Sequence, residues 1–193
     1  YEGLDLGERG TTALITYMRT DSVRIADEAR NAAKDFIVTT YGKDYYPPKP
    51  RMFKSKGGAQ DAHEAIRPVD VAITPDSVKP FLAPEQFNLY RLIWTRFVAS
   101  QMAGARVLDT TAIVIAADTT WRAKGEQLLF PGFQVLSPQK PDDVVDLPPL
   151  KAGQVLHLDK FEKEQKFTQP AARYTEASLV RELEEKGIGR PST

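Results

Sequence analysis

The apolar pattern of the sequence changes at Gly104 from one typical of helices to one typical of strands. Before it, residues 85–102 place aromatic and aliphatic side chains on one wide helical face, and Pro84 suits the first turn. After it, residues 110–116 and 119–124 carry the β-branched, alternating character of strands. These stretches predict an α+β protein whose helical and strand-rich parts follow one another along the chain.

Further elements are expected on both sides of this change. Residues 26–40 predict a helix whose buried stripe consists of Ala29, Ala32, Ala33, Phe36 and Ile37. Strand character continues in residues 127–135 and 155–161, the latter placing His157 on a half-exposed strand. Thr175 suits the N-cap of a last helix that ends at Gly187, with Leu179, Val180 and Leu183 as its buried face.

We therefore divide the sequence into three parts. Residues 1–104 form a mainly helical unit, residues 105–167 a strand-rich segment, and residues 168–193 the start of a further helical unit. Tyr90 and Trp94 are interpreted as core residues, since aromatic side chains at helical spacing are the usual filling of a helical domain. Arg91 and Arg96 are expected on the solvated face of the same helix.

Composition excludes several classes of function. The 193 residues contain 26 basic and 26 acidic side chains, so any attraction for nucleic acid must come from local charge segregation. The absence of cysteine removes disulfides, thiol catalysis and thiolate zinc sites. No apolar run approaches the ~20 residues that a membrane span needs, and no signal peptide is evident. We expect a soluble, cytoplasmic protein with no membrane partner.

A short apolar run delivers Tyr17 into a polar, turn-like stretch, two residues before Arg19. A tyrosine hydroxyl is ordinarily a poor nucleophile, because its pKa is about 10 in water and a nearby cation must favour the phenolate. The planar guanidinium of Arg19 can hold a phosphate bidentately. An extended backbone would place both side chains on one side. This pair is our candidate for phosphoryl transfer, although ordinary residues at a strand end are the alternative for any isolated Tyr-x-Arg.

Other candidate phosphate ligands lie further along the chain. Residues 60–67 predict a short helix ended by Pro68, which would place His63 and Arg67 on one face. Lys49, Arg51, Lys54 and Lys56 lie in a loop with interleaved aromatics, suited either to cradling a nucleic-acid backbone or to solvation alone. The C-terminal residues 187–193 combine flexible backbone with Arg190, Ser192 and Thr193, groups suited to phosphate contact.

The string Ile-Thr-Tyr-Met-Arg-Thr-Asp-Ser at residues 15–22 resembles the active-site segment of type IA DNA topoisomerases. Further matching blocks follow in the family's order: Ala-His-Glu-Ala-Ile-Arg-Pro at 62–68, Leu-Ile-Trp at 92–94 with Phe-Val-Ala-Ser-Gln-Met at 97–102, and residues 176–193. The methionine after the tyrosine resembles the bacterial topoisomerase I group rather than topoisomerase III. Reverse gyrase shares much of the pattern and remains an alternative, as does a nucleic-acid-binding module without chemistry.

The resemblance implies a reaction and a setting for it. Tyr17 would become joined to a 5′-phosphate of a single-stranded segment of negatively supercoiled DNA, with Arg19 offsetting charge and His63, Arg67, Arg190, Ser192 and Thr193 contacting phosphate. It also implies an ATP-independent, nucleoid-associated enzyme of toroidal shape, with residues 105–167 in a β-rich arch. Mg²⁺ would be held by a Toprim domain absent from these residues, so this chain alone is expected to be inactive and to need the remaining domains of its polypeptide.

Overall fold

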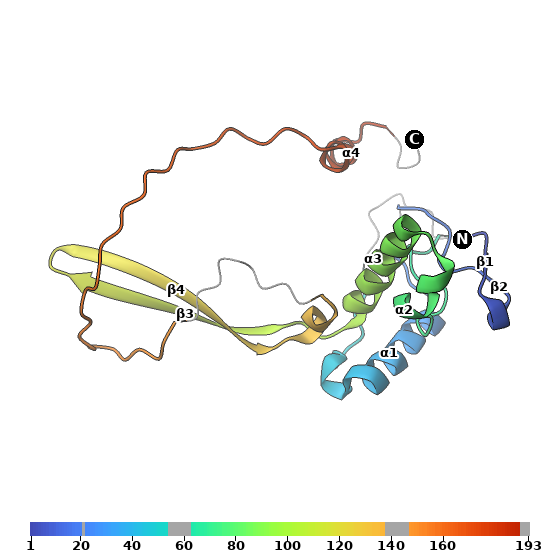
Figure 1. Cartoon of the computed structure of the whole chain (residues 1–193), viewed down its shortest axis with the longest axis horizontal. Coiled ribbons are helices and arrows are strands. Elements are labelled where there is room, and N and C mark those ends of the chain that lie inside the picture. The colour runs from blue at the N-terminus through green and yellow to red at the C-terminus, as the bar shows by residue number, and fades with distance from the viewer. Residues whose placement is uncertain (21, 54–62, 138–146, 190–193) are drawn as a thin grey trace.

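The structure is a computed structural model that describes residues 1–20, 22–53, 63–137 and 147–189. Its fold is α+β, as the sequence predicts. Helices α1 (Asp27–Tyr41), α2 (Pro75–Val78) and α3 (Pro84–Gln101) gather at one end, and strands β3 (Arg106–Ala116) and β4 (Thr119–Phe130) project from it as a long ribbon (Figure 1). Helix α4 (Glu176–Glu185) follows a long path without regular structure.

The core of the helical unit forms between α3, α1 and the segment that leads into α2. Tyr90 and Trp94 are buried in it, as expected, and both also use their polar atoms. The Trp94 indole N–H donates to the carbonyl of Val71 at 2.9 Å, and the Tyr90 hydroxyl donates to that of Ile73 at 2.6 Å. These bonds tie residues 71–73 to α3, because buried aromatic rings with polar atoms need such partners.

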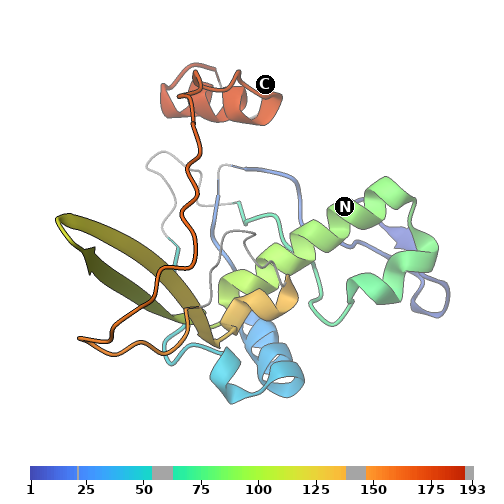
Figure 2. The same ribbon diagram turned by 60° about the vertical axis from the view of Figure 1, so that its left-hand side comes forward.

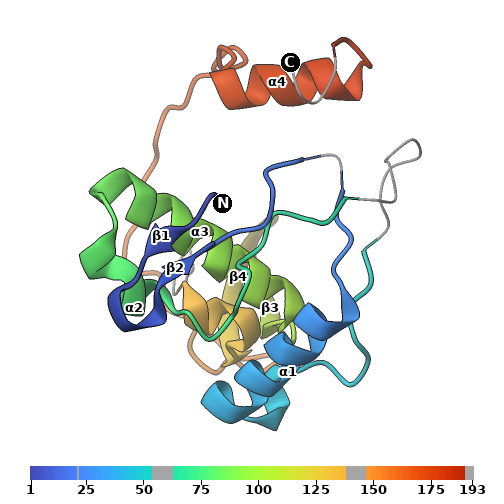
Figure 3. The same cartoon turned by 90° about the vertical axis from the view of Figure 1, so that its right-hand side faces the viewer.

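Helix α1 begins within one residue of its predicted start and lies beside α3 (Figure 3). Ala33 and Ile37 are fully buried, and the Phe36 ring meets that of Trp94 edge-on with centroids 5.6 Å apart. Ala32 is exposed, so the buried stripe is narrower than predicted. Burial of the 15-residue helix on one face supplies the tertiary support that a helix of this length needs.

Two antiparallel strand pairs are present in the part of the chain that the structure describes. The short pair joins β1 (Leu4–Asp5) to β2 (Thr11–Thr12). The long pair is the β3–β4 ribbon, which turns at residues 117–118, where Ala117 has a φ of 52°. Strand β3 begins before its predicted limit, and β4 joins the predicted strand at 119–124 to the first part of the one predicted at 127–135. The rest of that second prediction is wrong, because Gly132–Leu136 forms a 3-10 helix. The residues of the ribbon remain largely exposed, including Ile113 at 62% and Ile115 at 76%.

The base of the ribbon is fixed to the helical unit. The ring of Phe130 lies 4.9 Å from that of Tyr45, and the amide of Phe133 donates to the carbonyl of Ala103 at 3.0 Å. Gly132, with a φ of 50°, makes the turn between them. A Cβ added to Gly132 would lie 2.5 Å from backbone atoms of Gly104, so only glycine fits without displacement of the chain.

The expected strand at residues 155–161 is wrong, since this segment has no regular structure and no neighbouring strand in the described residues. Alternation alone does not make a strand where no backbone accepts its hydrogen bonds. His157 is therefore exposed and outside any strand. One side chain does reach the ribbon, because the ring of Phe161 meets that of Trp121 edge-on at 5.5 Å.

Helix α4 has the predicted ends but not the predicted burial. The side chain of Thr175 accepts a hydrogen bond from the amide of Ser178, and the amide of Ile188 donates to the carbonyl of Leu183 past Gly187. However, Leu179 and Val180 are 44% and 55% exposed, and α4 stands apart from α1 and α3 (Figure 2). The prediction that these side chains form a buried face is wrong for this structure, because α4 has no buried residue, although Leu183 is partly covered.

Candidate active site

The tyrosine segment is anchored immediately before Tyr17 by a neighbouring extended segment. Ile15 pairs with Pro68 in an antiparallel bridge, and the amide of Thr16 donates to the carbonyl of Arg67 at 3.0 Å. The hydroxyl of Thr16 also donates to the carbonyl of Ala65 at 2.8 Å and accepts from the amide of Arg67 at 3.0 Å. Thr16 therefore fixes the backbone on which the tyrosine stands.

A second anchor lies a few residues after the tyrosine. The hydroxyl of Ser22, a residue only 6% exposed, donates to the carbonyl of His63 at 2.7 Å and accepts from the amide of Arg24 at 3.2 Å. The amide of Ala65 donates to the carbonyl of Arg24 at 2.8 Å. The loop that carries Tyr17 is thus held at both ends against residues 63–69, between the bridge at Ile15 and the start of α1.

Tyr17 itself points outward from this anchored loop. Its side chain is 54% exposed and that of Met18 is 55% exposed, whereas Arg19 is partly buried. The amide of Arg19 donates to the carbonyl of Tyr17 at 3.0 Å, which closes a three-residue turn centred on Met18. The expectation of an extended backbone here is wrong, because this hydrogen bond folds the chain. Tyr17 therefore lies at the surface, outside the apolar core.

The predicted helix at residues 60–67 is wrong where the structure describes it, since residues 63–67 are not helical. Their backbone groups bond outward to Thr16, Ser22 and Arg24 instead of along a helix. This strap, residues 63–69, still brings His63 and Arg67 to the tyrosine loop, but by tertiary pairing rather than by helical spacing. Asp61 and its neighbours from 54 to 62 lie outside the described residues.

Arg67 is 9% exposed, and its guanidinium is already occupied by protein groups. It donates to the Glu64 carboxylate at 2.8 Å and to the carbonyls of Pro68 and Val69 at 2.9 and 3.3 Å. These contacts favour a structural role for the side chain, although phosphate binding by Arg67 stays a prediction. A buried cation with a carboxylate partner is costly to disturb, so Arg67 stiffens the strap.

Sequence reasoning assigned no role to Thr16, Ser22 or Glu64, although all three lie in the blocks that carried the resemblance. Glu64 accepts from the amide of Ala26 at 2.7 Å, so its carboxylate stands at the N-terminus of α1, where the helix dipole favours negative charge. The sequence does carry a signal for Thr16 and Ser22, because Ser and Thr side chains next to a polar loop commonly bond to backbone groups.

The remaining predicted ligands are placed only in part. Arg190, Ser192 and Thr193 lie outside the described residues, as do Lys54 and Lys56 of the basic loop. Lys49 and Arg51 are described and exposed. Charge on this loop is therefore available to solvent at its beginning, while the contribution of the other predicted ligands to any binding surface stays a prediction.

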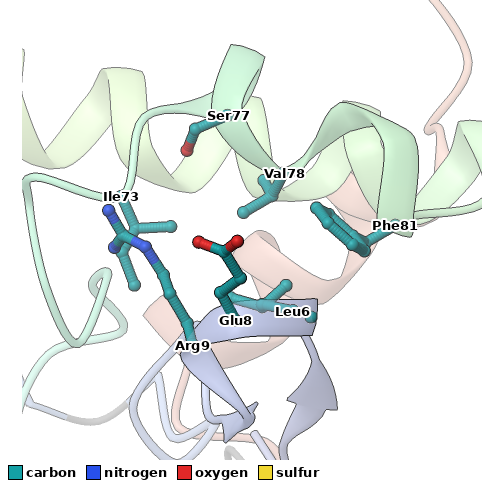
Figure 4. Close-up of a pocket in the computed structure, with 8 residues that line it drawn as sticks. Leu6, Glu8, Arg9, Ile73, Ser77, Val78 and Phe81 are labelled. Atoms are coloured by element: carbon teal, nitrogen blue, oxygen red, sulfur yellow. The ribbon is translucent and has the colours of Figure 1, made fainter.

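A shallow pocket of about 410 Å³ lies elsewhere, between the turn at Gly7–Arg9 and the start of the α2 region. Figure 4 shows the side chains of Glu8 and Arg9 extending toward the α2 segment, with the apolar Leu6, Val78 and Phe81 nearby. The residues of the tyrosine loop and of the strap do not line it. Within the described ranges, no group of His, Cys, Asp and Glu side chains could hold a metal ion, and no helix is long and apolar enough to cross a membrane.

Comparison with known proteins relates the whole chain to one family. A family model described as DNA topoisomerase matches residues 1–193. The structure is also similar to that of full-length topoisomerase I from Thermotoga maritima, with a TM-score of 0.76 and 33% sequence identity. The match covers 100% of this chain but 31% of that protein, so the chain spans about a third of its length.

Proposed function

Because this chain belongs to the DNA topoisomerase family, we propose that it is the tyrosine-bearing part of a bacterial type IA enzyme. Such an enzyme cuts one DNA strand, passes another strand through the gap and reseals the first, without ATP. The observation that carries the proposal is the exposure of Tyr17 on a loop held at both ends by Thr16 and Ser22. A rigid scaffold that presents one exposed nucleophile suits attack on a large substrate.

In the proposed reaction, the Tyr17 hydroxyl oxygen forms a bond to the phosphorus of a DNA phosphodiester. The bond from phosphorus to the 3′-oxygen breaks, the tyrosine loses its proton, and the departing 3′-oxygen gains one. The product is a 5′-phosphotyrosine and a free 3′-hydroxyl. One phosphate ester replaces another, so attack by the 3′-hydroxyl can restore the strand without an energy source. Arg19 offsets the negative charge that grows on the phosphate oxygens.

His63 is proposed to help position the DNA strand, because its backbone is bonded to Ser22 at the far end of the tyrosine loop. Arg67 supports the same strap from within, through Glu64 and two carbonyls. Since the whole chain carries no net charge, attraction for the DNA backbone must come from a local group of cations near Tyr17. Arg19 and the basic loop that begins at Lys49 are the candidates.

Mg²⁺ is proposed as the cofactor of the complete enzyme, held outside this chain. The roles proposed for Tyr17 and Arg19 use their own side chains and assign no metal ligand to either residue. The remaining parts of the polypeptide and DNA are the proposed partners, with a cytoplasmic, nucleoid-associated location. The match to about a third of the Thermotoga maritima protein supports the proposal that further parts of the polypeptide take part in the reaction.

The proposal is tested by replacing Tyr17 with phenylalanine in the full-length protein. The ring stays, but the attacking oxygen is lost, so the covalent complex with a labelled single-stranded oligonucleotide should disappear while DNA binding persists. Denaturing gel electrophoresis of the reaction measures the complex. A Tyr17→Phe protein that still forms it would exclude Tyr17 as the nucleophile, and a wild-type protein that binds but never forms it would favour a binding module without chemistry.

A matched pair of charge reversals tests the role of Arg19. Arg19→Glu should lower covalent-complex formation at least tenfold, because a carboxylate beside the phosphate opposes the charge that the transition state gathers. Arg96→Glu, on the exposed face of α3, should change it less than twofold at the same salt concentration. Circular dichroism confirms that both variants fold. Equal losses would mean that DNA attraction is diffuse rather than focused at the tyrosine loop.

A further inference from the structure

The ring of Tyr17 has one aromatic neighbour in the described chain, and this neighbour comes from the other end of a hairpin. Tyr1 meets Tyr17 edge-on, with ring centroids 5.0 Å apart and an angle of 80° between the ring planes. This is the preferred T-shaped geometry of an aromatic pair. Both rings are about half exposed, at 53% and 54%, so the contact leaves an open side on each.

The β1–β2 hairpin links the two segments that carry the tyrosines. Leu4 is paired with Thr12 and Asp5 with Thr11. Tyr1 precedes β1 and Tyr17 follows β2, so the pairing of the two strands brings these residues to the same end of the hairpin.

The turn of this hairpin is stabilised by glycine backbone conformations and by hydrogen bonds. Its residues Gly7 and Gly10 adopt positive φ angles of 69° and 65°, and the Asp5 carboxylate accepts from the amide of Gly7 at 3.0 Å. The amide of Leu6 donates to the carbonyl of Gly10 at 3.1 Å, and Leu6 is buried in the core. Before β1, Gly3 has a φ of 102°, and a Cβ there would come within 2.8 Å of the Thr11 side chain. The residues that follow Tyr1 are therefore held in a defined conformation.

We propose that Tyr1 is a positioning residue, which restricts the ring of Tyr17 to the orientation from which its hydroxyl attacks DNA. The proposal rests on the proposed function of Tyr17. A half-exposed tyrosine on a three-residue turn has freedom to rotate about its side-chain bonds. The edge-on contact removes part of that freedom before DNA binds, and a pre-oriented nucleophile reacts faster without binding its substrate more tightly.

The test uses the full-length enzyme with magnesium and a labelled single-stranded oligonucleotide, under single-turnover conditions. Tyr1→Ala should lower the maximal rate of covalent-complex formation about 2- to 10-fold, the range expected from losing one aromatic pair. The oligonucleotide concentration at half-maximal rate should change less than twofold. Tyr1→Phe, which keeps the ring, should react at the wild-type rate. Leu89→Ala, which truncates an exposed apolar side chain on α3, serves as the control.

A second measurement reports on the ring itself, without catalysis. Incorporation of 3-fluorotyrosine at position 17 allows its ¹⁹F resonance to be followed without DNA. Tyr1→Ala should shift this resonance, since the neighbouring ring current is lost, and Tyr1→Phe should leave it near its original position. An unchanged resonance in Tyr1→Ala would overturn the proposal even if the variant lost activity.

Three kinetic outcomes would also overturn it: a wild-type rate in Tyr1→Ala, an effect on half-saturation alone, or a failure of Tyr1→Phe to restore the rate. The first shows that the contact is idle, the second that Tyr1 binds DNA itself, and the third that its hydroxyl matters rather than its ring. Failure of the proposed function is recognised separately, because Tyr17→Phe would then still form the covalent complex.

Discussion

The helical unit and the β3–β4 ribbon handle their apolar side chains in opposite ways. In the helical unit, Val98 and Ile37 are fully buried, and the indole N–H of Trp94 bonds to backbone. In the ribbon, Ile115 is 76% exposed although it lies in a regular, well-paired strand. Both regions have regular backbone hydrogen bonding, but only one of them buries its apolar side chains.

This difference indicates which part of the chain carries its own stability. An isolated two-stranded ribbon is marginally stable in water, because neither face is covered. Helix α4 has the same character, with good caps and exposed leucine and valine side chains. The tyrosine loop lies in the region that has the buried core, since its anchors Thr16 and Ser22 bond to residues of the strap. The candidate active site therefore stands on the part of the chain that needs least support.

The largest expected effect breaks this comparison directly. Val98→Asp buries an uncompensated carboxylate at a fully enclosed position, so the free energy of unfolding of the helical unit should fall by about 4 kcal/mol or more. Ile115→Asp places the same charge on the exposed ribbon and should change it by less than about 0.5 kcal/mol. Urea unfolding of the 193-residue chain, followed by far-ultraviolet circular dichroism, compares the two. Similar losses would show that the ribbon is buried in solution.

A smaller effect is expected at the junction of the two regions. Gly132→Ala places a Cβ within 2.5 Å of Gly104 backbone atoms. The free energy of unfolding should fall by about 2 kcal/mol or more. Gly153→Ala is the matched control, because Gly153 also has a positive φ, 77°, but nothing lies within 4 Å of the added carbon. Gly153→Ala should lower the free energy of unfolding by about 1 kcal/mol, which is the penalty of the left-handed conformation alone. Hydrogen exchange at the Phe133 amide, which bonds to Ala103, reports the loosening. Equal exchange rates in both variants would mean that the junction is already open.

The smallest effect concerns a single buried hydroxyl. Tyr90→Phe should lower the free energy of unfolding by about 1 to 2 kcal/mol at neutral pH, because the carbonyl of Ile73 loses its donor. Burial, and then the charge of Asp70, raise the pKa of Tyr90 well above its ordinary value of about 10. The unfolded state therefore releases this proton first as the pH rises. Stability contributed by Tyr90 is complete below about pH 10 and declines above it.

The difference in the free energy of unfolding between wild type and Tyr90→Phe should therefore be smaller at about pH 11 than at about pH 8. Urea unfolding at both pH values measures it, and the remaining tyrosines contribute equally to the two proteins. A gap that widens with pH would contradict the buried, protonated state of this hydroxyl.

Local sequence signals predicted the elements that depend on local chemistry. The apolar face and Pro84 placed α3, the residues around Asp118 placed the ribbon turn, and Thr175 with Gly187 placed both ends of α4. They failed where distant residues decide. Residues 63–67 have a helical pattern, but Thr16 and Ser22 bond to their carbonyls, so they form no helix. Residues 155–161 alternate as a strand does, yet no described strand lies beside them.

The candidate site was predictable to the same degree. Tyr17 was singled out because an apolar run ends there in polar residues and because the segment resembles the family's active-site segment, whereas its exposure came from the structure. The three-residue turn at Met18 and the buried contacts of Arg67 did not follow, because both depend on hydrogen bonds that spacing cannot reveal. The contact between Tyr1 and Tyr17 joins residues on either side of the β1–β2 hairpin, and a local sequence pattern does not specify such a contact.

The identity of the residue that becomes joined to DNA tests the role of Tyr17 most directly. Full-length protein is reacted with a single-stranded oligonucleotide and magnesium, denatured, digested with nuclease and trypsin, and the modified peptide is sequenced by mass spectrometry. We predict a phosphate-linked nucleotide remnant on the hydroxyl of Tyr17, in the peptide that ends at Arg19. A remnant on any other residue, or on none while the DNA is cut, would contradict this role.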